Sequence, residues 1–194
     1  MRALFLLPVL LLLACGGNVR EAERATYDLG TFSVVWKPAD IAIAGVSARG
    51  PVWLSTPAIS YRLLYAGDMQ RNAYGESRWA APPADLIERA LNRQVSERGG
   101  CRLRLDIDEL IQLFDTPQSS RMLLDVRASL LSSTGETVLA RKAFSVARPA
   151  PSPDARGGVA AAGAAVQALG GELGAWLTET ARVKPAIARQ CRPE

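Results

Sequence analysis

The sequence predicts an α+β fold in which a mostly antiparallel sheet packs against two helices. Three observations support this prediction. After residue 100, apolar and polar residues alternate over three successive segments, as in strands with one buried face. Two other segments carry apolar residues at helical spacing. The 194-residue chain also has the length and the apolar content for one domain with a substantial core.

The first 14 residues have the features of a lipoprotein signal peptide. Arg2 precedes an apolar run from Ala3 to Ala14, which is well short of the ~20 residues that a membrane-spanning helix needs. The run ends in Leu12-Leu13-Ala14-Cys15, which resembles the lipobox of bacterial lipoproteins. That resemblance implies cleavage before Cys15 and lipidation of Cys15, whose several acyl chains would form a durable anchor. An ordinary signal peptide with a chance cysteine is the alternative.

We therefore expect three parts in the chain: a lipoprotein signal peptide (1–14), a lipidated tether (15–25) and one domain (26–194). Gly16 follows the lipidated cysteine. Under the enterobacterial sorting rule, an Asp at this position retains a lipoprotein in the inner membrane. The absence of Asp favours the outer membrane, with the domain facing the periplasm.

Strands and one helix are expected in the first half of the domain. Strand segments are predicted at 26–36, 41–46 and 59–65, and the Gly-containing segment 66–77 is predicted to be a polar loop. Pro82 and Pro83 fit the first turn of an amphipathic helix that Gly99-Gly100 would end. Its apolar stripe consists of Leu86, Ile87, Ala90, Leu91 and Val95.

The second half of the domain predicts a three-strand meander followed by a long helix. Strands are expected at 101–114, 121–131 and 137–147, with a bulge where the alternation slips at Glu109-Leu110. A Pro-rich linker (148–156) leads to a helix over 158–182 that is rich in Ala and Gly. Its stripe consists of Val159, Ala162, Val166, Leu169, Leu173, Trp176 and Leu177.

The composition argues against an enzyme and against nucleic-acid binding. The net charge is +4 with no clustered basic run, whereas a nucleic-acid surface is normally a basic face. The chain has no histidine, which removes the commonest general base and metal ligand. We expect no catalytic residues, no metal and no cofactor apart from the covalent lipid. Asp106 and Asp108 alternate with Arg102 and Arg104 on one face, which predicts cross-strand ion pairs rather than acid–base chemistry.

Two further cysteines remain once Cys15 is acylated. An exported protein meets an oxidising compartment, and an even pair there favours a disulfide between Cys101 and Cys191. The bond would join the end of the chain to the start of the meander. A buried free Cys101 with a thiol in the tail is the alternative.

Four residues are candidates for contact with a partner, since Trp and Arg dominate binding hot spots: Trp53, Arg62, Arg78 and Trp79. Trp79 would more commonly pack beneath the helix that follows it. Trp53 precedes the turn at Pro57 and is as readily exposed as buried. The two arginines could contact an acidic partner, although solvated strand charges are the commoner case.

Three soft motifs occur in order along the chain. Tyr27-x-Leu29 follows the lipobox, Trp53-Leu54-x-x-Pro57-x-Ile59-x-Tyr61-Arg62 comes next, and Arg78-Trp79-Ala80 with its prolines opens the first helix. Together they resemble the ABC-type transport auxiliary lipoproteins, the PqiC-like family. The resemblance covers most of the mature chain and includes the Ala-rich helix with Trp176-Leu177.

The resemblance implies a non-enzymatic role in transport. Lipoproteins of this family are partners of MCE-domain proteins and their ABC transporters, which are thought to move lipids or other hydrophobic molecules across the periplasm. The implied partners are an MCE-domain protein and the membrane, through the lipid anchor; a homo-oligomer is left open. Two alternatives also stay open: a structural or assembly lipoprotein of an outer-membrane complex, and a periplasmic lipid carrier with its own cavity.

Overall fold

A computed structural model describes residues 24–31, 41–93, 95 and 100–192. The strands are β1 (Ala25–Tyr27), β2 (Ile43–Arg49), β3 (Ala58–Leu63), β4 (Asn72–Trp79), β5 (Cys101–Thr116), β6 (Ser119–Leu131) and β7 (Val138–Pro149). The helices are α1 (Pro83–Asn92), α2 (Ala155–Val183) and α3 (Pro185–Gln190), with a 3-10 turn, η2 (Val52–Leu54). The predicted signal peptide (1–14) and Cys15 lie outside the described residues.

The strands form one seven-stranded sheet in the order β1-β4-β3-β5-β6-β7, with β2 also paired to β5. The long β5–β6 and β6–β7 ladders are antiparallel, as is β3–β4. The β1–β4, β2–β5 and β3–β5 pairs are parallel. The predicted α+β class is therefore confirmed, but the sheet is mixed and a third helix is present. Alternation in the sequence reports which face a residue occupies and not the direction of its neighbouring strand.

Strands β5, β6 and β7 form the predicted meander and supply most of the core. Leu103, Leu105 and Ile107 are fully buried on the inner face, opposite the buried residues of β6. The register between β5 and β6 shifts between Ile107 and Glu109, so the predicted bulge is confirmed. Beyond the bulge, Gln112 takes an inward position among the apolar residues.

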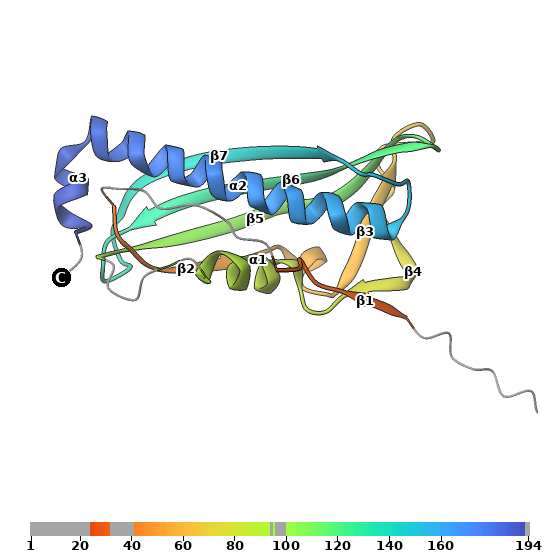
Figure 1. Cartoon of the computed structure of the whole chain (residues 1–194), viewed down its shortest axis with the longest axis horizontal. Coiled ribbons are helices and arrows are strands. Elements are labelled where there is room, and N and C mark those ends of the chain that lie inside the picture. Colours follow the sequence, from red (N-terminus) through yellow and green to blue (C-terminus); the bar gives the residue numbers. More distant parts are fainter. Residues whose placement is uncertain (1–23, 32–40, 94, 96–99, 193–194) are drawn as a thin grey trace, which may run out of the picture.

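Helices α1 and α2 lie on the same face of the sheet (Figure 1). Helix α1 contacts β2, while α2 runs across β6 and β7. Helix α2 begins at Asp154, whose carboxylate accepts a 2.7 Å hydrogen bond from the Gly157 backbone N–H; this bond lowers the pKa of the carboxyl group. Most of the predicted stripe is fully buried, so that α2 is held by packing despite its glycines.

Two sequence predictions need correction, and one element was not predicted. Segment 66–77, predicted to be a loop, contains most of β4. Strand β4 is polar because it lies near the end of the sheet, where backbone pairing to β3 and β1 holds it without a buried apolar face. The end of the chain, for which no element was predicted, contains α3. The strand predicted at 26–36 ends at Tyr27 in β1, since residues 28–31 are not strand; residues 32–36 of the prediction lie outside the described residues.

Helix α1 ends at Asn92, earlier than the predicted end at Gly99-Gly100. The Asn92 side chain binds the backbone of β2: its Oδ1 accepts from the Val46 N–H at 2.9 Å, and its Nδ2 donates to the Val46 carbonyl at 2.7 Å. These bonds fix the end of α1 against β2. No intrinsic helix propensity could signal them, because the partner lies 46 residues away in the sequence.

Cys101 and Cys191 form a disulfide, with their Cα atoms 4.9 Å apart and both residues fully buried. The backbone beside it is also joined: the Ala42 N–H donates to the Cys191 carbonyl, and the Cys101 N–H donates to the Ala42 carbonyl. The end of α3 is thereby fixed to the start of β5 and to the chain entering β2.

Replacing both cysteines (Cys101→Ser with Cys191→Ser) should lower the free energy of unfolding. The bond closes a loop with a sequence separation of 90, for which the chain-entropy model gives about 4 to 5 kcal/mol. Urea denaturation of the oxidised wild type, the reduced wild type and the variant measures the effect. The reduced wild type and the variant, which both lack the bond, should have similar free energies of unfolding. Two titratable thiols in denatured, unreduced wild type would contradict the bond.

A buried polar group connects the start of α2 to the sheet. The Gln112 side chain is fully buried; its Nε2 donates to Ser120 Oγ at 2.8 Å and to the Asp154 carbonyl at 3.1 Å. Its Oε1 accepts from the Tyr74 hydroxyl at 3.0 Å, and burial of that hydroxyl raises the Tyr74 pKa. Gly158 leaves the space for this amide, since a Cβ there would lie 2.1 Å from Gln112 Oε1.

Gly158→Ala should destabilise the protein by roughly 1 to 3 kcal/mol, because the added methyl group displaces a satisfied, buried amide. Gly171→Ala is the matched control in the same helix, since a Cβ there meets nothing within 4 Å. It should instead stabilise by up to about 1 kcal/mol through helix propensity. Thermal and urea unfolding compare the two; equal effects would show that the Gln112 contacts are unimportant.

Candidate functional site

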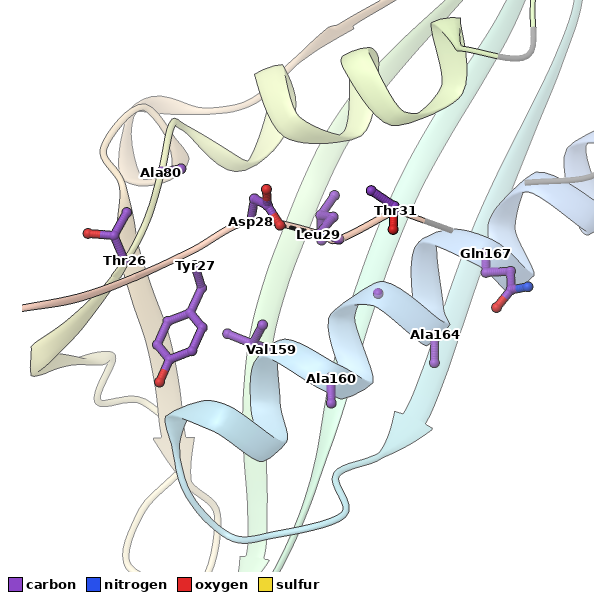
Figure 2. Close-up of a pocket in the computed structure, with 12 residues that line it drawn as sticks. Thr26, Tyr27, Asp28, Leu29, Thr31, Ala80, Val159, Ala160, Ala164 and Gln167 are labelled. Atoms are coloured by element: carbon purple, nitrogen blue, oxygen red, sulfur yellow. Dashed lines mark hydrogen bonds between the residues drawn. The ribbon is translucent and has the colours of Figure 1, made fainter. Parts of the chain in front are cut away.

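A groove of about 720 Å³ opens between the segment 26–31 and the first half of α2 (Figure 2). Tyr27 and Leu29 lie on one wall with Ala80, and the other wall is a face of the helix. The groove is the most apolar of the hollows that we describe.

The first wall is held by backbone hydrogen bonds. The Ala80 N–H donates to the Tyr27 carbonyl at 2.6 Å, which attaches the end of β1 to the residue after β4. The Asp28 carboxylate accepts from the Gly30 N–H at 2.7 Å, and Gly30 has a positive φ of 74° that favours glycine. Between them, Leu29 points into the core and is buried. The segment is therefore attached to the sheet at Tyr27 and to the core by Leu29, and Arg93 Nη1 donates to the Gly30 carbonyl at 3.4 Å.

The helical wall is low because its residues are small. Val159, Ala160, Gly163 and Ala164 line it, with Gln167 at the far end. Figure 2 shows Ala160 and Ala164 projecting from successive turns of α2. Small side chains let another apolar group approach the helix backbone closely.

The groove offers contact area rather than reactive chemistry. Its polar side chains are two threonines, one tyrosine, one aspartate and one glutamine, and no hydrogen bond joins any two of these side chains as a nucleophile–base pair. Within the described residues, no group of three or more His, Cys, Asp or Glu side chains could hold a metal ion. The arrangement fits the binding of an apolar surface or segment.

Only one of the four predicted partner-binding residues borders this groove. The Arg78 side chain is exposed on β4 and donates from Nε to Thr26 Oγ1, a groove residue, at 3.3 Å. Its neighbour Trp79 is 2% exposed and packs in the core, as the commoner interpretation of the sequence had it. Trp79 is thus a structural residue in this conformation and is not available to a partner.

Trp53 lies elsewhere, on η2, and is 55% exposed. Val52 beside it is exposed as well, so the two form an apolar pair at the surface. Leu54, the third residue of the turn, is buried and fixes η2 to the core. This pair has the exposure and chemistry of a binding hot spot.

Arg62 contributes to a polar cluster on the outer face of the sheet, the face opposite the helices. Its Nη2 lies 3.5 Å from Glu109 Oε2, the same oxygen that accepts from Arg71. Sequence reasoning missed Glu109 as the partner of Arg62 and Arg71 as the second arginine on the same carboxylate. The predicted bulge at Glu109 was the available signal; Arg71 was hidden in the segment predicted to be a loop.

The aspartates of β5 form the ion pairs that the sequence predicted. Asp108 accepts two 2.7 Å bonds from Arg127 on β6, and this interaction lowers the pKa of Asp108. Asp106 pairs with Arg49 on β2. Exposed pairs of this kind contribute little to stability.

Comparison with known proteins places this fold. The family model described as "ABC-type transport auxiliary lipoprotein component" matches residues 34–174. The crystal structure of protein XCC0632 from Xanthomonas campestris, of the family DUF330, superposes with a TM-score of 0.68 at 20% identity, over 84% of this chain and 99% of that one. A crystal structure of an uncharacterized protein superposes with a TM-score of 0.56 at 10% identity, over 79% and 98% of the two chains. No curated protein matches the sequence.

The likeness to the two crystal structures shows a shared fold. Among the described residues, no helix combines the length and apolar character that crossing a bilayer requires. The matched family is one of lipoproteins, which are held at a membrane by attached lipid. The family model spans more than half of the sequence, from before β2 to within α2, and the chain therefore belongs to the family of ABC-type transport auxiliary lipoprotein components.

Proposed function

We propose that the protein is a non-enzymatic outer-membrane lipoprotein that faces the periplasm and docks an MCE-domain protein of an ABC transport system. The system moves lipids or other hydrophobic molecules across the periplasm. The family match over residues 34–174 carries this proposal, because it identifies an auxiliary component of an ABC-type transporter. The lipobox at Leu12–Cys15 and the Gly16 that follows support the anchor and the choice of membrane.

The interior favours a docking module over a lipid carrier. A carrier needs an apolar cavity between the sheet and the helices. Here that space holds one continuous cluster of buried side chains, in which Val166, Leu169 and Leu173 of α2 pack with the inner residues of β5 and β6. The groove beside β1 and the hollow lined by Arg49, Arg104 and Arg141 both open to solvent at the surface.

The surface offers two features that fit a protein partner. The Val52–Trp53 pair provides exposed apolar area on a turn fixed by Leu54. The groove beside Arg78 provides a second apolar surface with a cation at its border. Aromatic and arginine side chains of this kind supply most of the energy in protein interfaces.

Affinity purification of the acylated protein from membranes tests the docking role, with mass spectrometry of both protein and lipid. We expect an MCE-domain protein to be recovered. Trp53→Ala should reduce its recovery about tenfold or more, since truncating an interface Trp commonly costs 2 kcal/mol or more. Arg62→Ala tests the polar cluster in the same assay.

Met69→Ala is the matched control, because Met69 is an exposed apolar residue that is 96% accessible on the loop after β3. It should leave recovery unchanged. Recovery of lipid with no MCE-domain protein would instead favour a carrier. Recovery of an outer-membrane β-barrel in its place would favour an assembly lipoprotein.

A further inference from the structure

The outer face of the sheet carries a basic hollow of about 470 Å³. Four arginines from four neighbouring strands line it: Arg49, Arg104, Arg127 and Arg141. Asp106 is the carboxylate in its lining. Neither the family match nor the docking role accounts for such a concentration of guanidinium groups.

The strand register explains the shape of this hollow. Ser129 on β6 is paired with Arg104 on β5 and with Arg141 on β7, so the two arginines lie on either side of a short residue. In the adjacent row, Ala143 on β7 is paired with Arg127. Neighbouring strands are about 4.8 Å apart, so Arg104 and Arg141 start roughly 10 Å apart across the sheet. Ser129 and Ala143 thus form a low floor between long arginine walls.

Two of the four arginines have a close carboxylate partner, one has a distant one, and Arg141 has none among the described residues. Arg49 pairs with Asp106 and Arg127 with Asp108. Arg104 Nε lies 4.0 Å from Asp106 Oδ2, which is too far for a hydrogen bond. Arg141 has no ion pair with any carboxylate of the described residues.

The Nε of Arg104 is also withdrawn from solvent and has no hydrogen-bond acceptor among the described residues, although the side chain as a whole is 31% exposed. A buried donor without an acceptor is unfavourable, and such a group calls for an explanation. An anionic oxygen in the hollow would satisfy it.

We propose that this hollow binds the phosphate of an anionic phospholipid headgroup. Guanidinium groups donate paired hydrogen bonds to phosphate, and Arg104 and Arg141 can do so from opposite sides. The volume leaves room for the rest of a headgroup beside the phosphate. The choice of a lipid over free phosphate rests on the proposed function, since a lipid anchor holds the domain where headgroups are concentrated.

Native mass spectrometry of the acylated full-length protein in a neutral detergent tests this proposal, with titration of phosphatidylglycerol. Diacylglycerol with the same acyl chains is the probe without phosphate, and inorganic phosphate is the free anion. The test variant is Arg104→Gln with Arg141→Gln. The control is Arg182→Gln with Arg189→Gln, which removes two exposed positive charges from α2 and α3.

We expect saturable binding of phosphatidylglycerol to the wild type and the control, and binding about tenfold weaker or worse in the test variant. Added salt should weaken the wild-type binding. Ala143→Glu, which places a carboxylate in the hollow at an exposed site, should have the same effect as the arginine variant and remains informative if that variant unfolds.

Equal binding by the test and control variants would overturn the site, as would diacylglycerol binding with the same dependence on Arg104 and Arg141. Inorganic phosphate binding as tightly as phosphatidylglycerol would overturn the lipid as the ligand. The titration uses purified protein without an MCE-domain partner. Absence of phosphatidylglycerol binding would therefore not contradict the docking role. Loss of partner recovery in the affinity purification would likewise not contradict the lipid site.

Discussion

Strand β5 is the constraint on which the rest of the structure depends, because three strands pair with it. One edge is occupied along its length by β6. The other edge is shared by β2, which pairs with residues 101–106, and β3, which pairs with residues 112–114 in the same direction. Strands β2 and β3 therefore lie in line along the same edge of β5, like one long strand that residues 50–57 interrupt. The interruption lies opposite the bulge of β5.

This interruption positions much of the candidate surface. The chain stops pairing with β5 at Gly50, after the end of β2, and resumes strand structure after Pro57 as β3. A Cβ at Gly50 would lie 3.1 Å from Leu54 Cβ. Trp53 is exposed because it lies on this excursion. The Glu109 carboxylate beside the bulge meets Arg62 and Arg71 at the same gap. A local loss of strand pairing thus produces both an exposed aromatic residue and a polar cluster.

The sequence predicted the features that depend on one element at a time. The β5–β7 meander, the bulge and the buried stripe of α2 follow from periodicity, which a single strand or helix carries in itself. Strand β4 was missed because its neighbours, and not its own residues, make it a strand. Parallel pairing was missed for the same reason, since at least 37 residues of sequence separate β2 and β3 from β5.

The candidate sites were less predictable than the fold, because each depends on residues from several strands. Arg62 could be named from the sequence, whereas Arg71, which shares the Glu109 carboxylate with it, required the geometry of the β3–β4 hairpin. From the sequence, Arg104 was expected to form a cross-strand ion pair, because it alternates with aspartates on one face of its strand. The structure shows that Asp106 pairs closely with Arg49 and Asp108 with Arg127. Arg104 keeps only a 4.0 Å contact with Asp106 and lies across Ser129 from Arg141.

The groove and the basic hollow lie on opposite sides of the sheet because α1 and α2 both cover one face of it. The groove lies on the helical side, between β1 and α2, whereas the basic hollow lies on the open side of the sheet. A ligand in one would not compete for space with a ligand in the other. The disulfide between β5 and the chain after α3 keeps the helical layer attached while the opposite face stays free. A partner bound in the groove on the helical side would therefore leave the proposed headgroup site on the open side accessible.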